Sequence, residues 1–283
     1  MENKVVITGI GAITPIGNNC SEFLDSLKSG KNGIKNTSLF DTTDFSVKIS
    51  GEVNIDLNSY FSNKELNKLD RFTTFSLLAA DEAIKQSKIT TKLNLDRIGV
   101  IIGSGIGGIG TFEKQHKRLL QHPKKVSPYF IPTMISDIAA GHISIKYGFK
   151  GINYGIVSAC ATGTHAIGNS YKQIKYGDAD IMVAGGSEAS ITPISIAGFS
   201  NMKALTKNPD INSASRPFDL NRDGFVMGEG AGILVLENKE HALKRNANIL
   251  CEISGYGATA DAYHLTSPTP GGLGAIKSME IAL

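Results

Sequence analysis

Residues Val157–Gly168, VSACATGTHAIG, join an apolar run to a segment with the apolar spacing of a helix. The run GINYGIVSA reads as a strand, whereas ATGTHAIGNSYKQIKYG repeats its apolar side chains at helical intervals. Cys160 falls at the junction, beside the first turn of the predicted helix and between small residues. A strand that turns directly into a helix is typical of an α/β fold.

The rest of the chain repeats this alternation of short apolar runs and longer helical patterns. Strands are predicted at 4–11, 97–105, 154–159, 180–188 and 230–237. Helices are predicted at 69–88, 134–148 and 160–177. Because the strands are apolar on both faces, we expect a sheet that is covered by helices on each side. Residues 204–222 are polar and lack a period, which predicts a loop.

A short pattern near the N-terminus recurs near the C-terminus. ITGIGAITP at Ile7–Pro15 and ISGYGATAD at Ile253–Asp261 share an isoleucine, a hydroxyl residue, two glycines and an alanine in register. Unless the match is coincidental, it predicts a first domain at 1–248 and the start of a duplicated second domain at 249–283. The ending GGLGAIKSMEIAL stops inside an apolar helical pattern, so we expect the chain to be cut from a longer polypeptide.

Composition and charge exclude several classes of protein. A formal net charge of +3 is too small to indicate a nucleic-acid-binding protein. No apolar run reaches the ~18 residues that span a membrane and no secretory signal is present, so we expect a cytoplasmic protein that binds no membrane. Cys20, Cys160 and Cys251 are far apart and form no CxxC pair, which argues against a disulfide framework or a metal site.

Cys160 is the candidate nucleophile. The unpaired amides and the dipole at a helix N-terminus favour an anion, and hence the thiolate form of a cysteine placed there. The alternative is a buried structural cysteine. His165 lies five positions further along the predicted helix and would face away from Cys160. His264 lies on a glycine-rich loop after a strand, which is a better position for a site.

The loop Gly103–Gly108, GSGIGG, formally fits the GxGxxG pattern after a strand. A dinucleotide-binding fold also needs an acidic residue about 20 positions later, where this sequence reads QHPKKVSPYF. We therefore favour a tight turn that lets the backbone approach another segment.

Five lysines lie on polar segments, and taken by themselves they indicate only ordinary solvated side chains: Lys64, Lys68, Lys124, Lys125 and Lys203.

Taken together, the motifs resemble those of one enzyme family. VSACATGTHAIG, GDADIMVAGGSEA, SRPFDLNRDGFVMGEGAGILVLE and DAYHLTSP, in this order and spacing, are similar to those of the β-ketoacyl-[acyl-carrier-protein] synthases, most like the type II enzyme of fatty-acid elongation. The similarity runs from VVITGIGAITPIGN to the last residue. It implies the thiolase fold, an αβαβα layered sandwich of two similar halves, of which the first would be complete here and the second only begun.

The resemblance implies a decarboxylative Claisen condensation. Cys160 would accept an acyl group from acyl carrier protein, and malonyl-carrier would then extend it. By family position, Ile106 and Phe199 would border the acyl pocket, and Thr266 and Ser267 would line the phosphopantetheine channel. The five lysines would form or border the patch that receives the acidic carrier protein. The resemblance implies a homodimer, with no metal and no cofactor other than the phosphopantetheine that carries the substrates.

The sequence also departs from the family. Its members place two catalytic histidines in the second half, one in an NAHGT-like motif and one in a GH motif preceded by lysine, and neither motif occurs here. We therefore expect condensation to require residues beyond this sequence. One alternative is a non-catalytic synthase-like fragment or subunit that binds carrier protein. A weaker one is a degradative thiolase, which uses coenzyme A thioesters.

Overall fold

The computed structural model describes residues 3–283 and contains a central six-stranded sheet in the order β5-β4-β6-β7-β1-β8. The strands β4, β5 and β6 are parallel, whereas β7, β1 and β8 each pair antiparallel to their neighbours. The bounds are β1 Val5–Ile13, β4 Ile98–Gly103, β5 Asn153–Ile156, β6 Ile181–Glu188, β7 Gly230–Asn238 and β8 Cys251–Ile253. A separate two-stranded sheet pairs β2 (Lys35–Asn36) with β3 (Ile49–Ser50).

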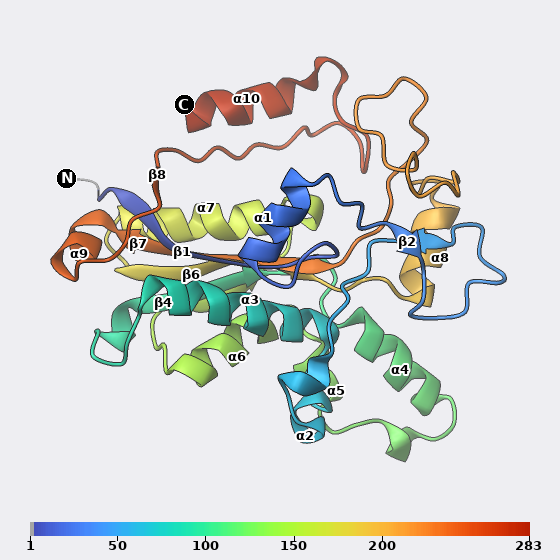
Figure 1. The fold of residues 1–283 in the computed structure, drawn as a ribbon, viewed down its shortest axis with the longest axis horizontal. Helices are drawn as coiled ribbons and strands as arrows, with labels where there is room; N and C mark the ends of the chain where they lie inside the picture. Colours follow the sequence, from blue (N-terminus) through green and yellow to red (C-terminus); the bar gives the residue numbers. More distant parts are fainter. Residues whose placement is uncertain (1–2) are drawn as a thin grey trace.

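Helices cover both faces of this sheet (Figure 1). The helices α3 (Arg71–Ser87) and α6 (Ile138–Tyr147) lie on one face, and α7 (Thr162–Lys175) lies on the other. The chain after β8 and the helix α10 (Leu273–Ala282) form a further layer above α7. The other α-helices are α1 Cys20–Lys28, α2 Asn63–Leu66, α4 Ile109–Leu119, α5 Phe130–Met134, α8 Pro193–Asn201 and α9 Lys239–Lys244. Short 3-10 helices are η1 Leu57–Ser59, η2 Leu95–Arg97, η3 Pro123–Lys125, η4 Ala159–Ala161 and η5 Pro270–Gly272.

Alternate side chains of the central strands fill two apolar cores. On β4, Val100 and Ile102 face the core shared with α3 and α6, whereas Ile101 faces the core under α7. The same alternation on β6 sends Val183 to the first core and Met182 to the second. This two-residue period follows from the strand geometry. The predicted α/β class, with a sheet covered on both faces, is therefore confirmed.

The predicted strands and helices are present with shifted ends, and residues 204–222 form the predicted irregular segment. The recurring glycine pattern has a structural counterpart. Gly9 and Gly11 lie against carbonyl groups one turn apart in α3, and Gly255 and Gly257 lie against carbonyl groups one turn apart in α10. A Cβ atom at any of the four would lie within 2.1 Å of one of those oxygens. Both segments therefore need glycine for the same close approach, while the division at 248 and 249 stays a prediction.

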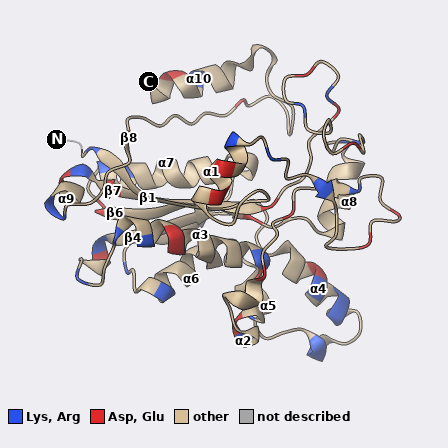
Figure 2. Cartoon of the chain, in the orientation of Figure 1, with Lys and Arg blue, Asp and Glu red and all other residues tan. Residues whose placement is uncertain are grey.

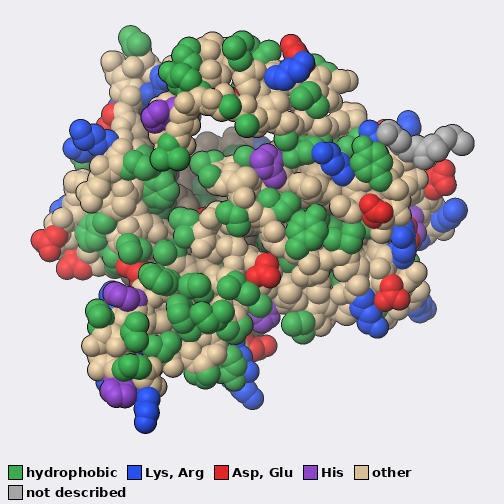
Figure 3. All heavy atoms as spheres, turned by 180° about the vertical axis from the view of Figure 1, so that it is seen from behind, with side chains coloured by type: hydrophobic (Ala, Val, Ile, Leu, Met, Phe, Trp, Pro, Cys, Tyr) green, Lys and Arg blue, Asp and Glu red, His purple; other side chains and the backbone are tan. Residues whose placement is uncertain are grey.

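The helix α10 has no buried residue. Its large apolar side chains, including Ile276 and Met279, are 45% and 59% exposed. Figure 3 shows the molecule hollowed beneath its upper part, where this layer lies. None of the helices formed by residues 3–283 is long and apolar enough to cross a membrane.

Candidate active site

Cys160 lies on a sharp turn between β5 and α7, as the sequence predicted. The strand β5 ends at Ile156, the short helix η4 follows, and α7 begins at Thr162. Ala159 has a φ of 48°, in the left-handed region that is unfavourable for a residue with a Cβ atom. The turn leaves Cys160 exposed rather than buried in the core. The alternative of a buried structural cysteine is therefore wrong.

Hydrogen bonds within the turn hold this conformation. The Ser158 amide donates to Thr162 Oγ1 at 2.8 Å, and the Ser158 hydroxyl lies 2.6 Å from Nδ1 of His165. His165 thus hydrogen-bonds within the turn, and its ring also packs edge-on against Tyr256. No side chain caps the N-terminus of α7. The Thr162 amide is already bonded to the Ala159 carbonyl, so it is the dipole of α7 that favours negative charge near Cys160.

The other two cysteines lie in different environments. Burial, together with the Glu82 carboxylate beside it, raises the pKa of Cys20 to about 12. This thiol consequently stays protonated and is a poor nucleophile near neutral pH. Cys251 is exposed on β8, at the edge of the central sheet. Of the three cysteines, only Cys160 combines exposure with the N-terminus of a long helix.

The glycine-rich loop after β4 packs against the turn that carries Cys160. Gly103 pairs with Ile156 in the neighbouring strand, and a Cβ atom on Gly103 would lie 2.3 Å from Thr162 Cγ2. The predicted close approach of the backbone is therefore present. Ile106, predicted to border the acyl pocket, lies on this loop with 41% of its surface exposed.

The other predicted substrate-binding residues lie on two separate segments. Phe199 is on α8, partly buried, with its ring 5.6 Å from that of Phe225. Thr266 and Ser267 are exposed on the irregular chain after β8, where both backbone amides donate to Nδ1 of His264 at 3.1 Å. His264 thus organises this turn. Their predicted roles in the acyl pocket and the phosphopantetheine channel stay predictions.

Four of the predicted lysines lie on one lobe of the molecule, which contains α2, α4 and α5. Lys64 is on α2, Lys68 follows it, and Lys124 and Lys125 form part of η3 after α4. Figure 2 marks further basic residues on α4, and Figure 3 shows hydrophobic and histidine side chains on the surface of this lobe. The Lys68 ammonium lies 4.7 Å from the Tyr129 ring centroid, which ties α2 to the start of α5. The fifth, Lys203, is exposed beyond the end of α8.

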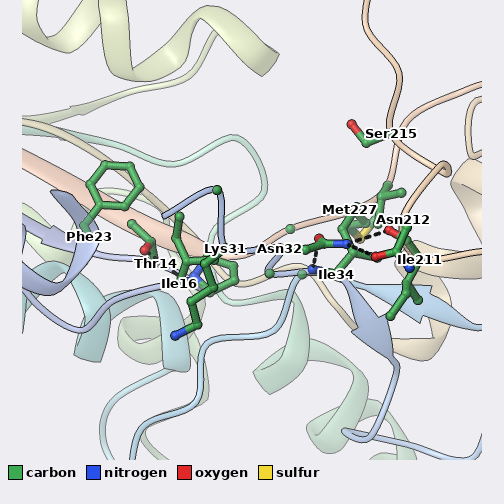
Figure 4. Close-up of a pocket in the computed structure, with 16 residues that line it drawn as sticks. Thr14, Ile16, Phe23, Lys31, Asn32, Ile34, Ile211, Asn212, Ser215 and Met227 are labelled. Carbon is green, nitrogen blue, oxygen red and sulfur yellow. Dashed lines mark hydrogen bonds between the residues drawn. The ribbon is translucent and has the colours of Figure 1, made fainter. Parts of the chain in front are cut away.

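A hollow of about 630 Å³ lies elsewhere, between the loop at 30–34 and the segment at 211–228 (Figure 4). Asn32 joins the two segments by donating to the Ile211 carbonyl at 2.7 Å, while its side-chain oxygen accepts from the Ile34 amide of its own loop at 2.8 Å. Because none of its lining residues belongs to the turn around Cys160, it is not the acyl site.

Within residues 3–283, no cluster of three or more His, Cys, Asp or Glu side chains could hold a metal ion.

Two carboxylates that shape the site were not identified from the sequence. Glu188, at the end of β6, accepts hydrogen bonds from Gly105 and Ile106 in the glycine-rich loop. Asp70 accepts from the amide and hydroxyl of Thr111 in α4, and burial raises its pKa. The available signal for Glu188 was its position after GGS at the end of a strand predicted to lie in the sheet.

Comparisons with known proteins agree with the motifs. A family model described as "Beta-ketoacyl synthase, N-terminal domain" matches residues 2–242. The chain is 50% identical to 3-oxoacyl-[acyl-carrier-protein] synthase 2 of Staphylococcus aureus, over 99% of this chain and 68% of that protein. It is 46% identical to the protein of the same name from Vibrio cholerae, over 100% of this chain and 69% of that one.

Solved structures with the same fold include ketosynthases. A type II PKS ketosynthase in complex with its acyl-carrier protein matches with a TM-score of 0.91 and 32% identity, over 100% of this chain and 70% of that chain. A β-ketoacyl synthase from Burkholderia phymatum matches with a TM-score of 0.89 and 29% identity, over 99% of this chain and 70% of that chain.

Proposed function

Since the chain belongs to the β-ketoacyl synthase family, we propose that its own residues carry out the acyl-transfer half of fatty-acid elongation, with Cys160 as the nucleophile. The observation that carries this proposal is the exposed Cys160 at the uncapped N-terminus of α7. The reaction of the complete family enzyme is the condensation of that acyl group with malonyl-carrier. Neither histidine motif of that second step occurs in this sequence.

The proposed acyl transfer follows from the geometry of the turn. The Cys160 sulfur attacks the carbonyl carbon of the carrier thioester and forms a new carbon–sulfur bond. The bond from that carbon to the phosphopantetheine sulfur breaks, and the carrier leaves as a thiol after taking up a proton. The α7 dipole stabilises the attacking thiolate. Ala159 and Ala161, on either side of the nucleophile, leave room for the substrate.

Intact-mass analysis tests this function. The purified chain is incubated with a short acyl group carried either on acyl carrier protein or on coenzyme A. We expect the mass to rise by one acyl group, and to rise faster with the carrier protein. Absence of transfer from either donor would contradict catalysis by this chain and would favour the non-catalytic alternative. Faster transfer from coenzyme A would favour the thiolase alternative.

We propose that the lobe formed by α2, α4 and α5, which carries four of the predicted lysines, binds the acidic carrier protein. The phosphopantetheine of that protein delivers the substrate. We expect the double variant Lys124→Glu/Lys125→Glu to raise the acyl-carrier concentration that gives half-maximal acylation rate by about tenfold, with little change in the maximal rate of acylation, because charge complementarity acts mainly on the encounter. Acyl transfer measured against carrier concentration at several salt concentrations checks this, and the variant should show a weaker salt dependence.

A matched control separates the local effect from net charge. Lys85→Glu/Lys92→Glu makes the same charge change at two exposed positions outside the lobe. If both double variants raise the half-saturating carrier concentration equally, the effect comes from net charge and the proposed docking surface is wrong.

We further propose that the chain is cytoplasmic and forms a homodimer through β5. This strand is at the edge of the central sheet, and Tyr154 and the adjoining Val157 are 37% and 59% exposed. An unpaired strand edge can hydrogen-bond to a second copy of itself.

A further inference from the structure

One carboxylate organises the loop that carries Ile106. Glu188 Oε2 accepts hydrogen bonds from the Gly105 amide at 2.7 Å and the Ile106 amide at 3.2 Å. Its Oε1 accepts from the Ser104 hydroxyl at 3.1 Å, and the Ser104 oxygen accepts from the Gly107 amide at 3.0 Å. Four consecutive residues of the loop are therefore connected to one side chain.

Gly105 lies where no larger residue would fit. A Cβ atom on Gly105 would lie 2.7 Å from Glu188 Oε2 and 3.8 Å from the Ala159 carbonyl oxygen. Gly105 thus lies close to both the carboxylate and the residue that precedes Cys160. Ser104 is 1% exposed, whereas the Ile106 side chain is exposed. Of these loop residues, Ile106 is the one whose large side chain is exposed beside the turn that carries Cys160.

The sheet explains why these residues meet. The parallel strands β4 and β6 are neighbours, with Gly103 paired to Gly186, so the segments after both strands leave the same edge of the sheet. Hydrogen bonds from amides to a charged carboxylate are shorter and stronger than bonds between neutral groups. The loop is therefore fixed by a charged group that does not itself belong to the loop.

We propose that Glu188 is a positioning residue that holds the loop Ser104–Gly107 in the conformation described here, so that Ile106 restricts the size of the acyl group that reaches Cys160. This rests on the proposed function and on the expectation, drawn from the family resemblance, that Ile106 borders the acyl pocket. Removal of the carboxylate frees the loop and widens access to the thiol. Glu188 acts on selectivity through Ile106 and makes no contact with the reacting atoms.

Alkylation of Cys160 tests this without any carrier protein. In a Cys251→Ser background, the rates of reaction with N-methylmaleimide and N-octylmaleimide are measured by peptide mass analysis. We expect Glu188→Ala to raise the ratio of the octyl rate to the methyl rate by roughly fivefold. The net loss of one hydrogen bond increases by about this factor the population of molecules in which the loop has moved away from the thiol. Glu188→Gln, which keeps an acceptor oxygen, should give a smaller increase.

A matched control removes a carboxylate-to-amide bond elsewhere. Glu22 Oε2 accepts from the Asn18 amide at 2.9 Å in α1, and Glu22→Ala should leave the ratio unchanged. Ser104→Ala removes the two hydrogen bonds of the Ser104 hydroxyl, to Glu188 and from the Gly107 amide, and should raise the ratio in the same direction as Glu188→Ala but by less, because the Gly105 and Ile106 amides keep their carboxylate. It also serves as the test if Glu188→Ala does not fold.

Hydrogen exchange gives a second readout, because the amides of Gly105 and Ile106 should lose protection in Glu188→Ala while those of β4 keep it. An unchanged or lower octyl-to-methyl ratio in both Glu188→Ala and Ser104→Ala would overturn the inference. So would unchanged protection of the two loop amides. Failure of acyl transfer from carrier protein would instead count against the proposed function, since maleimide alkylation does not require it.

Discussion

Replacement of Cys160 by alanine is expected to reduce acyl transfer to the chain by at least ~1000-fold, because no other side chain at the turn supplies an activated nucleophile. The measurement is the intact mass after incubation with acyl-carrier thioester. Cys160→Ser should be nearly as inactive, since a serine hydroxyl at a helix N-terminus is far less acidic than a thiol and needs a general base.

The other cysteines provide matched controls for this loss. Cys251 is exposed but lies on a strand, and Cys20 has its pKa raised to about 12 by burial and by Glu82. We expect Cys251→Ala and Cys20→Ala to accept the acyl group at the wild-type rate. Acylation that persists in Cys160→Ala, or disappears in Cys251→Ala, would show that the nucleophile has been assigned wrongly.

The turn that carries Cys160 could be predicted because its signals are local. An apolar run, a group of small residues and a helical pattern follow one another within Val157–Gly168. The strands β4, β6 and β7 could be predicted for the same reason. The order and direction of the strands could not, since they depend on pairs such as Gly103 with Gly186 that the sequence pattern does not reveal.

The contact between Glu188 and the glycine-rich loop shows the same limit within the site. Gly105 and Glu188 are 83 positions apart, so neither residue indicates the other in the sequence. Only the parallel pairing of β4 with β6 brings them together. Local patterns predicted both segments, but the interaction between them required the fold.

Glu229 and Arg71 form a buried ion pair that fixes the start of α3 and the start of β7. Arg71 Nη2 and Nε donate to the two carboxylate oxygens at 2.6 and 2.9 Å, and the Val53 amide donates to Glu229 Oε1 at 2.9 Å. The Glu229 side chain is 0% exposed, whereas that of Arg71 is 27% exposed. Removal of the arginine therefore leaves a carboxylate enclosed in the protein with only one of these donors.

Arg71→Met is expected to lower the free energy of unfolding by about 3–5 kcal/mol, since an unpaired charge in the interior keeps its desolvation cost and loses its compensation. Urea unfolding checks this through the shift in midpoint at constant slope. The double variant Arg71→Met/Glu229→Gln should recover much of the loss, because the neutral amide still accepts from Val53 and no charge stays buried.

A second arginine gives the comparison that decides whether burial is the cause. Arg97 Nη2 lies 2.9 Å from Asp180 Oδ1, but the two side chains are 36% and 33% exposed. Arg97 also donates to the Gly177 and Asp178 carbonyls, but water screens the ion pair and can replace these donors at the surface, so Arg97→Met should cost only about 1 kcal/mol. Equal destabilisation by the two substitutions would show that the loss at Arg71 does not come from a buried unpaired charge. A much larger loss at Arg71, restored by Glu229→Gln, would identify the enclosed carboxylate as its source.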